Sequence, residues 1–181
     1  MDRRDFIKST IAGLTVTLSS GAVSASAPKV DQKKADQKKA EVFQLHGTDV
    51  YGKPLDLKDF AGRTVLVSFF TFDCSACSHD LQLMRDFYLR NVKKNFVLLG
   101  VNVDQNKKAL DDYNEAATFA YPKDQRFPTV WRFAPGHTDS FGKLNATPSH
   151  FVLNSKHQLM FRRDGAFQPD DWDNLYLSLP S

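Results

Sequence analysis

The chain has 181 residues, of which 41% are hydrophobic and 25% are charged, and it contains 15 phenylalanines. This composition excludes a disordered or collagen-like chain and suffices for one domain with a hydrophobic core. The net charge of +3 is unevenly distributed, because residues 1–40 carry eight Lys and Arg against four Asp, whereas residues 41–181 carry 16 against 17 acidic residues. The basic excess therefore belongs to the N-terminal extension, and we expect no nucleic-acid partner.

Residues 1–25 have the pattern of an export signal. Arg3 and Arg4 lie in a basic segment, the stretch 9–23 is uncharged, and small residues follow. The segment Arg3-Arg4-Asp5-Phe6-Ile7-Lys8 resembles a twin-arginine signal, with an ordinary secretion signal as the alternative. We expect cleavage after Ala25 and a periplasmic mature protein, in which disulfides can persist.

Residues 26–40 form a Lys-rich segment in which the pentapeptide at 31–35 is repeated at 36–40. A polar tract of this kind has no apolar face to bury, so it is predicted to be a flexible spacer. Docking to anionic lipid is the alternative, but the lysines are diluted by aspartates, so any membrane association should be transient.

Residues 41–181 are predicted to form one α/β domain. A turn at 51–55 joins two short strand-like segments into an N-terminal hairpin, and apolar runs at 64–70 and 96–103 predict central strands covered on both faces. The remaining expectations are a helix from Ser75, a helix over 107–119, a short strand over 127–133, a brief helix over 140–143, a hairpin of 150–153 with 159–162, and a helix over 172–179. This order indicates a mixed sheet with helices on both faces.

The only two cysteines, Cys74 and Cys77, follow the first buried strand directly and open the first helix. Residues three apart in a first helical turn share a face, so the two sulfurs can come within disulfide reach. The helix N-terminus favours a thiolate at Cys74, the exposed nucleophile, while Cys77 is shielded and can resolve a mixed disulfide. The spacing therefore predicts a redox pair.

Four stretches resemble the thioredoxin-like domain of the TlpA/ResA family of extracytoplasmic thiol–disulfide oxidoreductases. They are residues 52–63, Cys74-Ser75-Ala76-Cys77, residues 98–104 and residues 141–153. The resemblance implies a three-layer thioredoxin-like sandwich, a cis Pro148 against Cys74, and a Thr147 whose backbone binds the substrate chain. It also implies a client protein with a disulfide, of the cytochrome c or copper-centre maturation type, and a membrane thiol-electron transporter as reductant. No metal or organic cofactor is required.

The chain departs from the family pattern beside the cysteines. Asp73 replaces the usual Trp before the first Cys, and Ser68 stands where ordinary thioredoxins have a buried acid. A carboxylate at Asp73 disfavours the Cys74 thiolate, which predicts a reductase rather than a disulfide-installing oxidase. Asp80, one turn after Cys77, is our candidate proton acceptor, and a solvated helix residue is the equal alternative.

Other functions remain open. Four histidines could accompany the thiols in a Sco-type copper protein, although His79 and His157 are expected to be solvated. A thiol peroxidase would need a cationic pocket, for which Asp73 has the wrong sign. A purely structural disulfide would close only a tiny loop and add little stability. Phe72, Trp131 and Phe133 could form an apolar rim, but at least two of them are expected to pack in the core.

Overall fold

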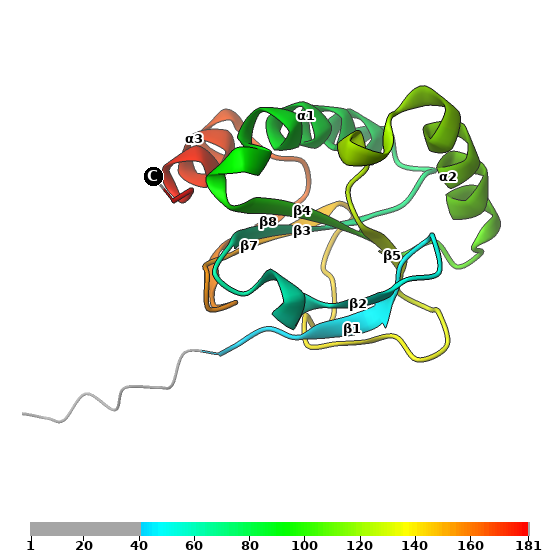
Figure 1. Ribbon diagram of the computed structural model, residues 1–181, viewed down its shortest axis with the longest axis horizontal. Helices are drawn as coiled ribbons and strands as arrows, with labels where there is room; N and C mark the ends of the chain where they lie inside the picture. The colour runs from blue at the N-terminus through cyan, green and yellow to red at the C-terminus, as the bar shows by residue number, and fades with distance from the viewer. Residues whose placement is uncertain (1–40, 181) are drawn as a thin grey trace, which may run out of the picture. The chain divides into compact units, whose positions relative to one another are not determined.

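A computed structural model describes residues 41–180 of the chain (Figure 1). Its main element is a five-stranded mixed sheet in the order β5-β4-β3-β7-β8. Parallel pairing joins β3 to β4 and β4 to β5, whereas β7 runs antiparallel to both β3 and β8. The strands are β3 (Thr64–Phe70), β4 (Phe96–Asn102), β5 (Thr129–Trp131), β7 (Ser149–Leu153) and β8 (Leu159–Asp164).

The two central strands confirm the prediction from their apolar runs. Every residue of β3 and of β4 is buried, because each strand has a neighbour on both sides and a packed layer on both faces. Strand β8 forms an edge, and none of its residues is fully buried. Because β3 is the central strand of the sheet, Cys74, which follows it in the chain, lies at the middle of the sheet's edge.

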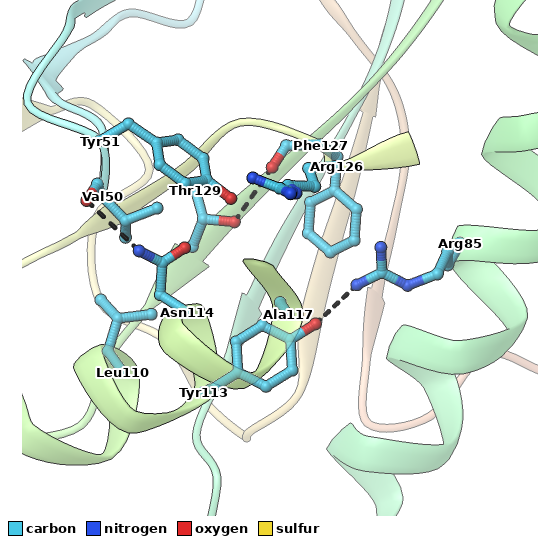
Figure 2. Close-up of a pocket in the computed structure, with 10 residues that line it drawn as sticks. All are labelled: Val50, Tyr51, Arg85, Leu110, Tyr113, Asn114, Ala117, Arg126, Phe127 and Thr129. Carbon is cyan, nitrogen blue, oxygen red and sulfur yellow. Dashed lines mark hydrogen bonds between the residues drawn. The ribbon is translucent and has the colours of Figure 1, made fainter. Parts of the chain in front are cut away.

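All three α-helices lie on one face of this sheet (Figure 1). Apolar side chains of α1 and α3 pack with alternate residues of β3 and β4. Helix α2 lies beside α1, since Arg85 of α1 donates a 2.6 Å hydrogen bond to the hydroxyl of Tyr113 in α2 (Figure 2). The helices are α1 (Ser75–Asn91), α2 (Lys108–Ala120) and α3 (Pro169–Leu177), and short 3-10 turns follow α1 at Val92–Lys94 and α2 at Lys123–Gln125.

A second, three-stranded sheet covers the opposite face. It has the order β2-β1-β6, and β1 and β2 form the predicted N-terminal hairpin. Its strands are β1 (Leu45–Thr48), β2 (Pro54–Asp56) and β6 (Thr138–Asp139). The 3-10 helix η1 (Leu57–Phe60) follows β2 directly in the chain. Phenylalanine rings join the two sheets in one core, for example Phe69 and Phe141 with ring centroids 5.2 Å apart.

The prediction of helices on both faces is therefore wrong for the α-helices, although three layers are present. Both parallel crossovers, β3-α1-β4 and β4-α2-β5, run in the same direction across the sheet. Right-handed crossovers in one direction place their helices on the same face. The other face is left to the small sheet and the 3-10 helix η1.

The predicted brief helix over 140–143 is also wrong. The carbonyl of Gly142, which would accept an amide four residues on in a helix, accepts the side chain of Arg132 instead. Gly142 has φ of 69°, in the left-handed region, which does not continue a right-handed helix. The segment is a loop that leads toward Pro148.

Candidate functional site

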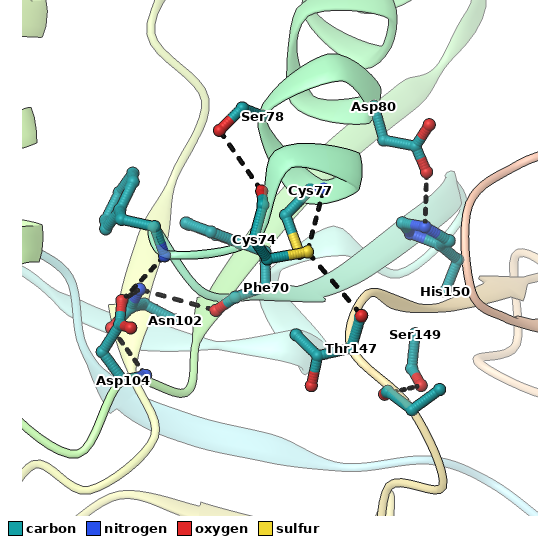
Figure 3. Close-up of a disulfide and its surroundings, with 12 residues drawn as sticks. Phe70, Cys74, Cys77, Ser78, Asp80, Asn102, Asp104, Thr147, Ser149 and His150 are labelled. Atoms are coloured by element: carbon teal, nitrogen blue, oxygen red, sulfur yellow. Dashed lines mark hydrogen bonds and ion pairs between the residues drawn. A yellow bond between two sulfur atoms is a disulfide. The ribbon is translucent and has the colours of Figure 1, made fainter.

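The cysteines form a disulfide at the N-terminus of α1, at the end of β3 (Figure 3). Their Cα atoms are 5.2 Å apart. Cys74 is half-buried at the N-cap position, with Cys77 one turn into the helix and 1% exposed. The amide of Cys77 donates to the sulfur of Cys74 at 3.1 Å. One accessible and one shielded sulfur at a helix N-terminus is the arrangement that the spacing predicted.

A polar cluster at the end of β4 supports the loop before Cys74. The carboxylate of Asp104 accepts the amide of Phe72 at 3.2 Å and the side-chain amide of Asn102 at 2.7 Å. The backbone carbonyl of Asp104 accepts the indole N–H of Trp131. We did not assign these residues to the site from the sequence, although polar residues that follow a buried strand next to β3 could have indicated them. They hold the residues that lead into the disulfide.

The loop before β7 lies against the accessible sulfur. The Thr147–Pro148 peptide bond is cis, as the resemblance implied, and the carbonyl oxygen of Thr147 is 3.7 Å from the sulfur of Cys74. The hydroxyl of Ser149 donates to the carbonyl of Ala146 at 2.6 Å, which ties the loop to the start of the strand. The structure thus brings Thr147 and Pro148 to Cys74, while their binding of a substrate chain stays a prediction.

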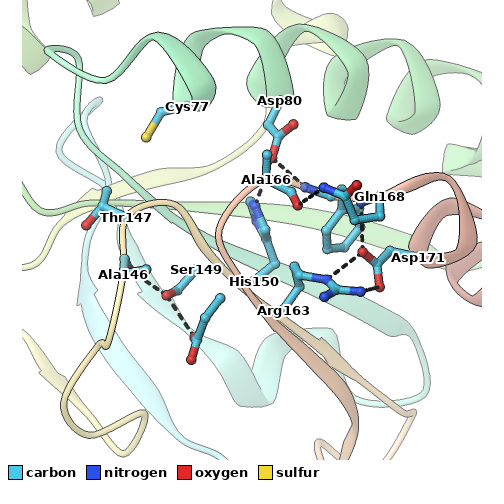
Figure 4. Close-up of polar contacts among 12 residues, drawn as sticks. Cys77, Asp80, Ala146, Thr147, Ser149, His150, Arg163, Ala166, Gln168 and Asp171 are labelled. Carbon is cyan, nitrogen blue, oxygen red and sulfur yellow. Dashed lines mark hydrogen bonds and ion pairs between the residues drawn. The ribbon is translucent and has the colours of Figure 1, made fainter.

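Asp80 is buried, with 2% of its surface exposed, so the alternative of a solvated helix residue is wrong. One carboxylate oxygen, Oδ2, lies 3.1 Å from Nε2 of His150 and accepts the amide of Phe167 at 2.9 Å (Figure 4). We did not expect His150 to contact Asp80. The available signal was a histidine within an apolar strand together with an acid on the apolar side of the first helix. Proton exchange between Asp80 and Cys77 stays a prediction.

Asp73 is exposed next to Cys74 in the chain, and its effect on the thiolate stays a prediction. Of the three aromatic residues considered for a rim, two are partly buried: Phe72 lies 4.7 Å from the ring of Tyr113, and Trp131 bonds to Asp104. Phe133 is 47% exposed. Phe72 packs against the hydrophobic core, whereas Trp131 belongs to neither core cluster, so the expectation that at least two of the three pack in the core is met only for Phe72.

Within the described residues, no hydrogen bond joins a histidine to the sulfur of Cys74 or Cys77. His79 is exposed, as predicted, but His157 is only 6% exposed, so its predicted solvation is wrong. The turn that carries His157 is covered by the segment before β1, where the amide of Phe43 donates to the carbonyl of His157. Within residues 41–180, no three His, Cys, Asp or Glu side chains are grouped closely enough to hold a metal ion.

The predicted export signal with Arg3 and Arg4, and the Lys-rich spacer, lie outside the described residues. No helix in the described part of the chain combines the length and the hydropathy needed to cross a membrane.

The chain is similar to thiol–disulfide oxidoreductases in both sequence and fold. It is 25% identical over 75 residues to the thiol-disulfide oxidoreductase ResA of Bacillus thuringiensis, which is 41% of this chain and 43% of that protein. The ResA of Bacillus anthracis matches over the same length with 24% identity. The chain thus spans less than half the length of these curated relatives.

Solved structures share the fold at low identity. StoA of Bacillus subtilis has a TM-score of 0.54 and 20% identity, covering 75% of this chain and 96% of that one. A thioredoxin family thiol:disulfide interchange protein of Chlorobium tepidum has a TM-score of 0.60 and 17% identity, covering 80% and 99%. The predicted thioredoxin-like fold is thereby confirmed. The family model described as the AhpC/TSA family matches residues 36–162, most of the chain. The chain belongs to the AhpC/TSA family.

Proposed function

We propose that the protein is an extracytoplasmic thiol–disulfide oxidoreductase that reduces disulfides in client proteins. The observation that carries this proposal is the Cys74–Cys77 disulfide at the start of α1, with its accessible sulfur beside the Thr147 carbonyl. An exposed strand-like backbone next to a reactive sulfur can align a client chain across the site. The names of the ResA relatives and of the structural neighbours support the same activity.

The reaction begins with the reduced protein. The amide of Cys77 and the helix N-terminus stabilise a thiolate at Cys74, which attacks one sulfur of the client disulfide and releases the other as a thiolate. Cys77 then loses its proton and attacks the sulfur of Cys74. The bond between Cys74 and the client breaks, the client leaves reduced, and the two electrons of the dithiol have passed to it. A membrane thiol-electron transporter would return the protein to its dithiol form.

The direction of electron flow rests on Asp73. Its carboxylate beside Cys74 disfavours the thiolate, so the reduced form is less stable and the protein is a stronger reductant. Equilibration with glutathione measures this directly. We expect a potential clearly below the value of about −180 mV typical of protein disulfide isomerase. We also expect Asp73→Asn to raise the potential, and a wild-type value at or above that of the isomerase would contradict a reductase.

Clients are best identified by trapping. A Cys77→Ser variant cannot resolve the mixed disulfide, so it should hold its client on Cys74, with apocytochrome c and copper-centre proteins as the expected classes. A Cys74→Ser variant is the matched control and should hold none. Peroxide consumption with a thiol donor tests the peroxidase alternative, and we expect no turnover, because the charged neighbour of Cys74 in the chain is an acid.

Export is proposed from the twin-arginine pattern and places the mature protein in the periplasm. Replacing both Arg3 and Arg4 by lysine should retain the protein in the cytoplasmic fraction. Export that is unchanged in this variant would assign the segment to the ordinary secretion route.

A further inference from the structure

A buried pair of titratable side chains lies between α1 and the central sheet (Figure 4). Asp80 of α1 and His150 of β7 are 2% and 0% exposed, and Nε2 of His150 is 3.1 Å from Oδ2 of Asp80. The amide of Phe167 donates to the same oxygen. Among the described residues, Oδ1 of Asp80 has no hydrogen-bond partner, so it remains able to take part in proton exchange.

The pair is placed on the same side of α1 as the resolving cysteine. Asp80 follows Cys77 by three residues, and both side chains project from the buried side of the helix toward the sheet (Figure 4). Cys77 is 1% exposed, so bulk water has little access to its sulfur. At neutral pH, where hydroxide is scarce, a proton that leaves Cys77 therefore passes most readily to an acceptor within the protein.

His150 has the features of a group that exchanges a proton. Its Nδ1 is buried and has no partner among the described residues, and neither has the hydroxyl of Ser68, the cross-strand neighbour of His150 in β3. An imidazole bonded to a carboxylate through one nitrogen keeps its second nitrogen as a possible proton acceptor.

The charged and titratable groups around this imidazole come from three elements. Asp80 and Cys77 belong to α1, Arg163 is the cross-strand neighbour of His150 in β8, and Asp171 belongs to α3. Arg163 and Asp171 bond to each other through two hydrogen bonds of 2.7 and 2.9 Å, so their charges largely compensate. Asp80 is thus the ionisable partner that His150 contacts directly.

We propose that His150 is a positioning residue of the redox reaction, which forms with Asp80 the unit that accepts the proton of Cys77. The inference rests on the proposed function. In the resolving step the proton of the Cys77 thiol passes to the Asp80–His150 pair, and the resulting thiolate bonds to the sulfur of Cys74. The bond between Cys74 and the client breaks, and the client sulfur leaves with the electron pair. Because the proton moves from one buried residue to another, the transfer by itself does not change the net charge of the core.

The aromatic disulfide DTNB separates the two cysteines in one experiment. Attack by Cys74 of the reduced full-length protein releases the first coloured thiolate, and displacement by Cys77 releases the second. His150→Gln retains a side-chain amide for Asp80 but cannot carry a proton. We expect it to slow the second release about tenfold or more near pH 7, while the first changes by less than about twofold. The difference should narrow toward pH 9, where hydroxide removes the thiol proton without help.

Matched variants make the result decisive. His79→Gln removes an exposed histidine of α1 and should leave both releases unchanged. Asp80→Asn should slow the second release as His150→Gln does, and the double variant should be no slower than the single ones, because the two residues act as one unit. Near-UV circular dichroism of the oxidised proteins reports whether the fold is retained.

Three results would overturn the inference: an unchanged second release in folded His150→Gln, an equal slowing of both releases, or a defect that does not depend on pH. Failure of the proposed function would look different. In that case the wild-type protein itself would release only one thiolate or none, because no Cys74–Cys77 disulfide would form.

Discussion

The carboxylate of Asp139 is held by three neighbouring residues. It accepts two hydrogen bonds of 2.8 Å from Arg132, lies 3.0 Å from Nε2 of His137, and accepts the amide of Phe141. Only 4% of its side chain is exposed. These contacts fix strand β6 and the loop that leads toward Pro148, so Asp139 connects the stability of the small sheet to the site.

Burial by itself would raise the pKa of Asp139, but the hydrogen bonds from His137 and Arg132 outweigh it and lower the pKa from 3.8 to about 2. A shift of this size corresponds to about 2 kcal/mol, and solvent screening at Arg132 reduces it to about 1–2 kcal/mol. Because the pKa is lowered on folding, this contribution is present above pH 3.8 and is lost as the pH falls toward 2.

The test compares Asp139→Asn with the wild type by thermal and urea unfolding at pH 7 and near pH 2.5. We expect the variant to be less stable by at least about 1–2 kcal/mol at neutral pH, or about 2–8 °C in Tm, and the difference to shrink in acid. Asp111→Asn, which removes an exposed partner of Lys107, is the control and should change neither value measurably. A difference between wild type and Asp139→Asn that stayed constant from pH 7 to 2.5 would refute the electrostatic reasoning.

Two further predictions concern the surroundings of the disulfide. Asp104→Ala removes the carboxylate that accepts the amide of Phe72 and the side-chain amide of Asn102. We therefore expect the free energy of unfolding in urea to fall by about 1–3 kcal/mol and the protein to reduce insulin disulfides more slowly. If neither quantity changed, Asp104 would not hold the loop. Burial raises the pKa of Tyr113 above 10.0 despite the nearby Arg85, so one tyrosine should ionise later than the rest in an ultraviolet titration, and Tyr113→Phe should abolish that late step.

The cysteine pair was predictable from local chain properties. An apolar run followed by Cys74 and Cys77 and then a helical pattern defines a strand-to-helix junction, and its geometry depends on residues that are neighbours in the chain. The cis Pro148 was predictable only through the resemblance, since trans is the commoner state for a proline before a strand. The core strands followed from composition, because a strand covered on both faces must be apolar throughout.

The positions of the helices were not predictable in the same way. The face that α2 covers depends on β5 lying beyond β4 in the sheet, and strand order is a long-range property. The loop at 140–143 was mistaken for a helix because its pattern gave no sign of the left-handed conformation of Gly142 or of the hydrogen bond that Arg132 makes with its carbonyl.

Taken alone, the sequence determined that the chain carries a redox-type cysteine pair at the end of a buried strand, and that its basic charge belongs to the N-terminal extension. Only the tertiary structure decided which buried polar groups accompany that pair. Asp80 and His150 are 70 residues apart in the chain and meet because β7 pairs with β3 under α1. Periodicity reports which face of an element is buried, whereas the partner of a buried charge depends on how distant elements pack.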